Sequence, residues 1–135
     1  MLRPKQTKYR KSQKRRIHPF YDYKANKLKF GILGLKSMNT GHLSAQQIEA
    51  GRRAITSSMK RQGKVWIRAF PDYPVTSKPA EVRMGKGKGA VDYWVCRIKS
   101  GKILYEVAGN SPEIMKLALK KAAIKLPVST RIVSL

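Results

Sequence analysis

The sequence is poor in acidic residues. Of its 135 residues only seven are Asp or Glu, against 30 Lys and Arg, so the formal net charge is +23 at pH 7. A compact domain with this charge repels itself unless a polyanion lies against it. The composition therefore limits the partners to nucleic acid, an anionic membrane surface or an acidic protein.

Cysteine and histidine are also scarce. Cys96 is the single cysteine and cannot form an internal disulfide, which agrees with a reducing compartment. The histidines, His18 and His42, stand apart, and no set of Cys, His and carboxylates has metal-ligand spacing. The acids are scattered, and solvation or ion pairs explain them better than a paired-carboxylate nuclease would. We predict no catalytic residue, no metal and no cofactor.

Long apolar segments are missing. No run of 18 apolar residues occurs, which excludes a transmembrane helix. The first sixteen residues are charged but are followed by no apolar segment and no small-residue cleavage site, unlike a secretory signal. They also lack the amphipathic face of a transit peptide, so we interpret them as part of the mature protein. A hydrophobic content of 41% is enough for one modest core.

Residues 1–26 are predicted to form a basic extension that binds RNA. Eight cations and no acid occur among the first sixteen residues, a block that cannot order itself around its own core. Tyr9, Phe20, Tyr21 and Tyr23 interleave with the charge, which suits base stacking beside phosphate neutralisation. A solvated flexible tail is the alternative. The cations assigned to RNA are Arg3, Lys5, Lys8, Arg10, Lys11, Lys14, Arg15 and Arg16.

Alternating apolar residues predict strands in the rest of the chain. The strand over 64–70 is partly apolar on both faces and is expected to be central, and the PDYP sequence at 71–74 then breaks the sheet. Ser100 and Gly101 mark a hairpin between two later strands. The predicted strands cover 28–34, followed by a turn at 39–41, then 64–70, 91–96, 102–108 and 128–133.

Two helices are predicted between these strands. Ser44 and Gln47 have capping-box spacing, and Gly63 is a stop signal. Ser111 is an N-cap before Pro112, and the second helix ends at residue 127. The expected core faces are Ile48, Gly51, Ile55 and Met59 on the first helix, where Gly51 allows close approach to a sheet, and Ile114, Ala118, Ala122 and Leu126 on the second.

The element order predicts an α+β fold with two helices packed on a mixed or antiparallel sheet, in one domain over 27–135. Arg53 and Lys60 project from the face of the first helix opposite its apolar stripe, and Arg61 lies shortly before the Gly63 stop signal. They are either solvated or directed at phosphate, and given the net charge we assign them to RNA.

A finger-like loop is predicted between two strands at 83–89. Its alternating glycines permit positive φ and expose backbone amides, while its cations add charge without apolar bulk. The spacing matches neither a P-loop nor a dinucleotide-binding fingerprint. A flexible connector is the alternative, but strands on both sides favour a presented functional loop. The loop residues are Arg83, Met84, Gly85, Lys86, Gly87, Lys88 and Gly89.

Several long motifs, in order along almost the whole chain, resemble the large-subunit ribosomal protein L sixteen family of bacteria and organelles. The sequence differs most from the commonest bacterial form of this family over 12–43, where it is rich in aromatic residues. The motifs that carry the resemblance are MLRPKQTKYRK, LSAQQIEAGRRAI, KRQGKVWIRAFPDYPVTSKPAEVRMGKGKG, DYWVCRIKSGKILYE and KKAAIKLPVSTRIV.

The resemblance implies a structural, non-enzymatic protein of the large ribosomal subunit whose α+β fold contains a β-hammerhead. The implied partners are large-subunit ribosomal RNA, tRNA acceptor arms and neighbouring large-subunit proteins, with no membrane. The finger would point towards those acceptor arms near the peptidyl transferase centre, and the extension would thread into ribosomal RNA. A free nucleic-acid chaperone or regulator is the second hypothesis. A membrane-active basic protein is the third, disfavoured because the helix stripes are core-like.

The resemblance and the composition also bear on compartment. The match begins at the first residue, from which we expect no long import extension, as in a bacterial protein or one encoded inside an organelle. The Lys-rich, acid-poor divergence favours a mitochondrial matrix over a plastid stroma or a bacterial cytoplasm.

Overall fold

The computed structural model describes residues 2–17, 20–109 and 111–135. His18, which the sequence predicts to stand apart, lies outside these residues. Nine elements occur in the described part of the chain. They are β1 (Leu33–Ser37), β2 (Gly41–Ser44), α1 (Ala45–Ser58), β3 (Lys64–Ile67), β4 (Tyr73–Ser77), β5 (Ala90–Ile98), β6 (Ile103–Ala108), α2 (Pro112–Ala123) and β7 (Thr130–Ser134).

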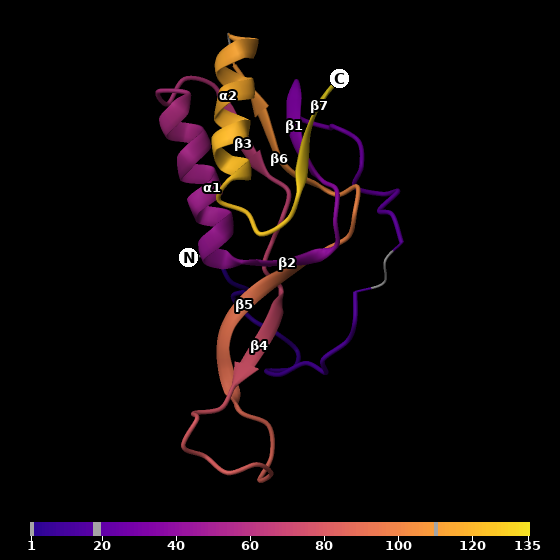
Figure 1. The fold of residues 1–135 in the computed structure, drawn as a ribbon, viewed down its shortest axis with the longest axis vertical. Coiled ribbons are helices and arrows are strands. Elements are labelled where there is room, and N and C mark those ends of the chain that lie inside the picture. The colour runs from indigo at the N-terminus through magenta and orange to yellow at the C-terminus, as the bar shows by residue number, and fades with distance from the viewer. Residues whose placement is uncertain (1, 18–19, 110) are drawn as a thin grey trace.

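The strands form two antiparallel sheets. One has the order β3-β6-β1-β7 and the other the order β2-β5-β4. Both helices lie beside the four-stranded sheet, whereas β4 and β5 extend away from it as a hairpin (Figure 1). The predicted α+β class with two packed helices is confirmed, and both sheets are antiparallel.

The hydrophobic core lies between the helices and the four-stranded sheet. Gly51 of α1 contacts Tyr105 of β6, because a Cβ at Gly51 would lie 2.5 Å from the Tyr105 hydroxyl. That hydroxyl donates a 2.8 Å hydrogen bond to the carbonyl of Ile48, and burial raises the pKa of Tyr105. The predicted close approach of Gly51 to a sheet is therefore confirmed.

The start of α1 agrees with its sequence signal, whereas its end comes earlier than predicted. Ser44 Oγ accepts a hydrogen bond from the Gln47 amide, and Gln47 Oε1 accepts one from the Ser44 amide. Beyond the last turn, Lys60, Arg61 and Gly63 have φ values of 48°, 64° and 98°. Positive φ values do not occur within a right-handed α-helix. The capping box is confirmed, but the helix ends at Ser58, before the predicted stop, so Lys60 lies beyond the helix and not on its face.

The core face of α2 differs from its prediction by about one residue. Ile114 is 48% exposed, while Met115, Ala118, Leu119 and Ala122 are buried. Met115 therefore replaces Ile114 on the stripe, because the 3.6-residue period fits either set and only packing against α1 selects one. Ser111 occupies the N-cap position but its side chain makes no capping hydrogen bond.

Two strand predictions were wrong in position. The first strand begins at Leu33 rather than near residue 28, and Phe30 and Ile32 are 60% and 51% exposed. The strand expected over 64–70 ends at Ile67 and lies at the edge of its sheet. Its second apolar face is covered by the segment before β1, as the stacking of Phe30 on Trp66 shows, with ring centroids 6.1 Å apart.

The predicted hairpin at Ser100 and Gly101 was also wrong. β5 pairs with β2 and β4, whereas β6 pairs with β1 and β3, so this turn joins the two sheets. The PDYP sequence does not end all strand structure, because β4 starts at Tyr73 and includes Pro74. An edge strand tolerates this proline, since one side of it needs no ladder donor.

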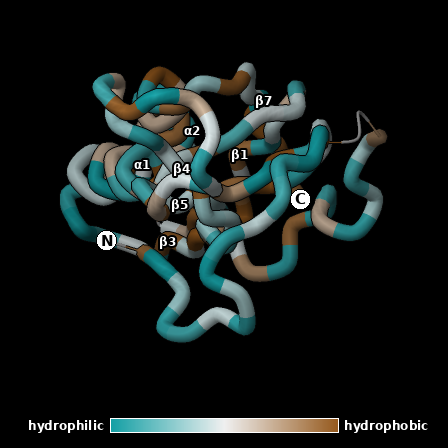
Figure 2. Tube along the Cα trace, turned by 90° about the horizontal axis from the view of Figure 1, so that it is seen from below, coloured by the Kyte–Doolittle hydropathy of each residue, from teal (hydrophilic) through white to brown (hydrophobic). Residues whose placement is uncertain are grey.

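Hydropathy follows this architecture. Seen from the finger end, hydrophilic residues dominate the N-terminal segment, whereas many hydrophobic residues lie among the helices and strands (Figure 2). Cys96 is buried, as expected of a small packed residue, and burial raises the pKa of its thiol.

Candidate nucleic-acid interface

The finger is the loop at the far end of the β4–β5 hairpin, furthest from the helices (Figure 1). Every residue from Arg83 to Lys88 is exposed, and the Met84 side chain is as open as in an extended chain. Gly85, Lys86 and Gly87 have φ values of 93°, 53° and 84°, and a Cβ at either glycine would meet nothing within 4 Å. These residues form an exposed loop between β4 and β5. Its ligand stays a prediction.

The base of the finger is closed by backbone contacts. A Cβ at Gly89 would lie 2.2 Å from the Ser77 carbonyl oxygen, so glycine is required where the two strands meet. Lys78 Nζ donates to the Gly85 carbonyl across the loop. The hairpin therefore fixes where the loop begins and leaves its tip without side-chain packing.

The basic extension lies along this hairpin. Lys11 Nζ donates to the Lys88 carbonyl at 2.9 Å, and Lys88 Nζ donates to the Ser12 carbonyl. The Tyr73 hydroxyl of β4 donates to the Gln13 carbonyl at 2.6 Å. Two predicted groups of cations, the extension and the finger, are thus brought together.

The helix cations lie elsewhere. Arg53 lies within α1, Lys60 and Arg61 follow its last residue, Ser58, and α1 lies away from the finger (Figure 1). Arg53 Nε is 3.1 Å from Glu49 Oε1, yet the Arg53 side chain stays 76% exposed. Arg52 binds the same carboxylate, and this hydrogen bond lowers the pKa of Glu49 to about 2. The predicted RNA-binding residues therefore form two separate groups.

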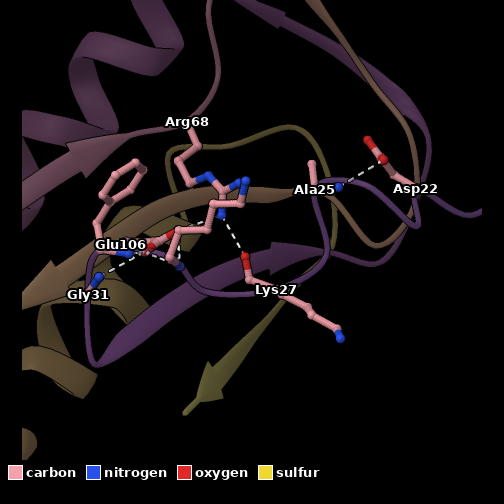
Figure 3. Close-up of polar contacts among 8 residues, drawn as sticks. Asp22, Ala25, Lys27, Gly31, Arg68 and Glu106 are labelled. Atoms are coloured by element: carbon pink, nitrogen blue, oxygen red, sulfur yellow. Dashed lines mark hydrogen bonds and ion pairs between the residues drawn. The ribbon is translucent and has the colours of Figure 1, made fainter.

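A buried ion pair anchors the chain between the extension and β1. Glu106 Oε2 accepts hydrogen bonds from the Phe30 and Gly31 amides at 2.7 and 2.8 Å. Glu106 Oε1 accepts from Arg68 Nη1 at 2.6 Å, and the same Arg68 nitrogen donates to the Lys27 carbonyl at 2.6 Å (Figure 3). This cluster ties the segment 27–31 to the outer face of the four-stranded sheet.

The protonation of Glu106 follows from these contacts. Burial opposes the charged form, but hydrogen bonds from Gly31, Phe30 and Arg68 outweigh it and lower the pKa of the carboxyl. Sequence reasoning described this acid only as one that solvation or an ion pair explains. The available signal was its position inside the apolar run ILYEVA, where a lone charge needs a partner.

Aromatic side chains of the extension are accessible, as base stacking requires. Tyr9 and Tyr23 are 72% and 79% exposed, and the Lys8 ammonium lies 5.5 Å from the Tyr9 ring centroid. Tyr21 is more enclosed, because it packs edge-on against Tyr23 at 5.4 Å and covers Gly101.

Metal-binding clusters and membrane-spanning helices are absent from the part of the chain that the structure describes. In residues 2–17, 20–109 and 111–135, no three His, Cys, Asp or Glu residues are grouped so that they could hold a metal ion. No helix built from those same ranges is both long and apolar enough to cross a membrane.

Known proteins match this chain over almost all of its length. The model of the family described as ribosomal protein L16p/L10e matches residues 4–133. "Large ribosomal subunit protein uL16" of Cereibacter sphaeroides is 58% identical over 134 residues, which are 98% of this chain and 96% of that protein. The proteins of the same name from Psychrobacter cryohalolentis and Gluconobacter oxydans are 56% and 55% identical over 133 residues, with the same coverage. The chain therefore belongs to the ribosomal protein L16p/L10e family.

Proposed function

We propose that this chain is a structural constituent of the large ribosomal subunit that binds ribosomal RNA and helps to position tRNA near the peptidyl transferase centre. Family membership supports the first part. The observation that carries the rest is the finger, an exposed cationic loop held at the end of a paired hairpin and joined to the basic extension. Its partners are ribosomal RNA, tRNA acceptor arms and neighbouring large-subunit proteins.

The proposed mechanism is electrostatic and architectural. The cations of the extension neutralise crowded phosphates, which a net charge of +23 favours strongly. The two sheets and two helices form the support, and the β4–β5 pairing holds the finger at a fixed distance from it. The division into a basic extension over 1–26 and a domain over 27–135 with a finger at 83–89 is part of this proposal.

A triple substitution separates the role of the finger from folding. Replacing Arg83, Lys86 and Lys88 by Ala removes three exposed cations, so stability should change by about 0.5 kcal/mol or less per site. A charge-assisted hydrogen bond from one of these side chains to a phosphate is worth roughly 1.5 to 3 kcal/mol. We expect normal occupancy in large subunits but slower tRNA accommodation or peptide-bond formation. Lys116, Lys120 and Lys121 of α2 are exposed and provide the matched control for equal loss of charge.

Subunit occupancy is read by quantitative mass spectrometry, and translation rate is measured on purified ribosomes. Full occupancy with an unchanged rate would reduce the finger to a passive connector. Failure to assemble would make the finger an anchor in ribosomal RNA. A wild-type chain that does not sediment with large subunits would instead favour a free RNA chaperone or regulator.

The compartment of the ribosome is a separate part of the proposal. The acid-poor composition favours the mitochondrial matrix, with a plastid stroma and a bacterial cytoplasm as alternatives. The relatives named above are bacterial proteins. They support the bacterial alternative and give no support to the mitochondrial preference. Fractionation of the source cells, followed by immunodetection in each ribosome pool, decides between them.

A further inference from the structure

The first residues of the chain enclose a groove against the hairpin. We name residues 2–11 the strap. At one end Leu2 packs against the hydrophobic core, and at the other Lys11 Nζ holds the Lys88 carbonyl at 2.9 Å. Between these anchors the strap faces residues 90–94 of β5 and residues 44–47 at the start of α1. The groove is open to solvent along one side and has a volume of about 1840 Å³.

The lining of the groove is cationic. Arg3, Lys5, Arg10 and Lys11 project from the strap, and Asp92 is the one acid on the walls among the described residues. The start of α1 adds partial positive charge, which no acidic residue in its first turn offsets. A groove of this charge favours an anion.

The opposite wall offers aromatic surface. Tyr93 and Trp94 of β5 line the groove, and Tyr93 is 49% exposed in the part of β5 that pairs with β4 but not with β2. A cationic track beside an accessible aromatic ring is the combination by which proteins hold single-stranded nucleic acid.

Size and shape narrow the ligand further. Pockets for small molecules measure about 300 to 1000 Å³ and are mostly apolar, so this space is too large and too charged for one. The strap is anchored at both ends beside β5, and a flexible single strand can follow a groove between two such anchors. An extended single strand of RNA, with its phosphates against the cationic strap and its bases against the aromatic wall of β5, fits both walls.

We propose that the groove beneath the strap binds an unpaired segment of RNA. Arg3, Lys5 and Arg10 bind its phosphates, and Tyr93 stacks on a base. This inference rests on the proposed function, because it names which form of RNA the extension takes and which of its cations do so. Lys8, Lys14 and Arg16 belong to the same basic extension but do not line the groove.

That division of the cations provides the test. Binding of a labelled single-stranded RNA of about 12 nucleotides, and of a duplex of the same sequence, is measured by fluorescence anisotropy across a salt series. Two triple variants carry the same loss of charge from the same extension. The groove variant is Arg3→Ala/Lys5→Ala/Arg10→Ala, and the control is Lys8→Ala/Lys14→Ala/Arg16→Ala.

For three phosphate contacts, the groove variant should reduce the salt slope on single-stranded RNA by about 2. The control also removes cations that bind RNA, but from outside the groove, so it should lower the slopes on single strand and duplex alike. The groove variant should leave the duplex slope close to the wild-type value. Tyr93→Leu, which leaves the anchors of the strap in place, should weaken single-strand binding about tenfold and leave duplex binding unchanged.

Each outcome has one meaning. A groove variant that weakens single-strand and duplex binding alike, as the control does, with Tyr93→Leu silent, would overturn the groove while leaving RNA binding by the extension intact. Equal effects of Tyr93→Leu on duplex binding and on single-strand binding would overturn the preference for unpaired RNA. A wild-type chain that binds neither RNA would overturn the proposed function itself.

Discussion

Replacing Glu106 by Gln tests whether the buried ion pair fixes the chain between the extension and β1. The carboxylate is fully buried and accepts hydrogen bonds at both oxygens, from Arg68 on one side and from the Phe30 and Gly31 amides on the other. Glutamine has the same shape but only one acceptor oxygen, so its amino group must face a donor on one side. Arg68 would also lose its counterion.

Removal of one partner from a buried, hydrogen-bonded pair costs about 3 to 5 kcal/mol. In a chain of this size such a loss corresponds to a fall in Tm of about 10 to 20 °C. Urea and thermal unfolding of the purified chain at pH 7 measure it. Glu81→Gln is the matched control, because Glu81 is exposed in the loop between β4 and β5 and makes no ion pair among the described residues. It should change stability by about 0.5 kcal/mol or less.

The same substitution should change how the stability of the fold depends on pH. The folded-state pKa of Glu106 lies below its ordinary value, so its contribution to stability is complete above the pKa of an unfolded glutamate, about 4.3. The contribution is lost as pH falls through the lower folded-state pKa. Glu106→Gln should therefore flatten stability against pH in this acidic range. A cost no larger than that of Glu81→Gln, with an unchanged pH profile, would refute the reasoning.

Three further predictions concern other parts of the molecule. Gly51→Ala should lower the free energy of unfolding in urea by about 1 to 2 kcal/mol, because overpacking against the buried Tyr105 hydroxyl exceeds the roughly 1 kcal/mol gained in helix propensity. A gain in stability would contradict this packing. Deletion of residues 1–16 should keep a cooperative thermal transition but weaken incorporation into large subunits, and loss of that transition would place the core boundary earlier. Cys96 should react with a thiol reagent far more slowly in the folded chain than in denaturant, because burial raises its pKa; equal rates would show that this strand opens readily.

Local signals in the sequence predicted local structure correctly, because the residues that carry each signal also form the contacts that it indicates. Ser44 and Gln47 are three residues apart and satisfy each other's backbone amides without help from the rest of the fold. The alternation of glycines at 85–89 likewise predicted a loop whose conformation needs positive φ. Both features depend only on near neighbours.

Features that depend on distant partners were missed. Ser100 and Gly101 correctly indicate a chain reversal, but nothing in them specifies that the strands on either side join different sheets. Trp66 suggested a central strand because its face is apolar, whereas the cover comes from Phe30, 36 positions earlier. The groove was missed for the same reason, since it needs the strap and β5 to meet.

The pairing of β1 with β7 has a consequence for the order of folding. β1 pairs Leu33 with Ser134 and Ser37 with Thr130, so the four-stranded sheet brings together segments that are almost the whole length of the domain apart. On the ribosome that synthesises this chain, β1 emerges early and keeps one edge unpaired until residues 130–134 are made. Such non-local pairing slows folding and leaves an edge open to wrong partners in the meantime. Completion of the four-stranded sheet therefore has to wait until residues 130–134 are made, after all of its other strands.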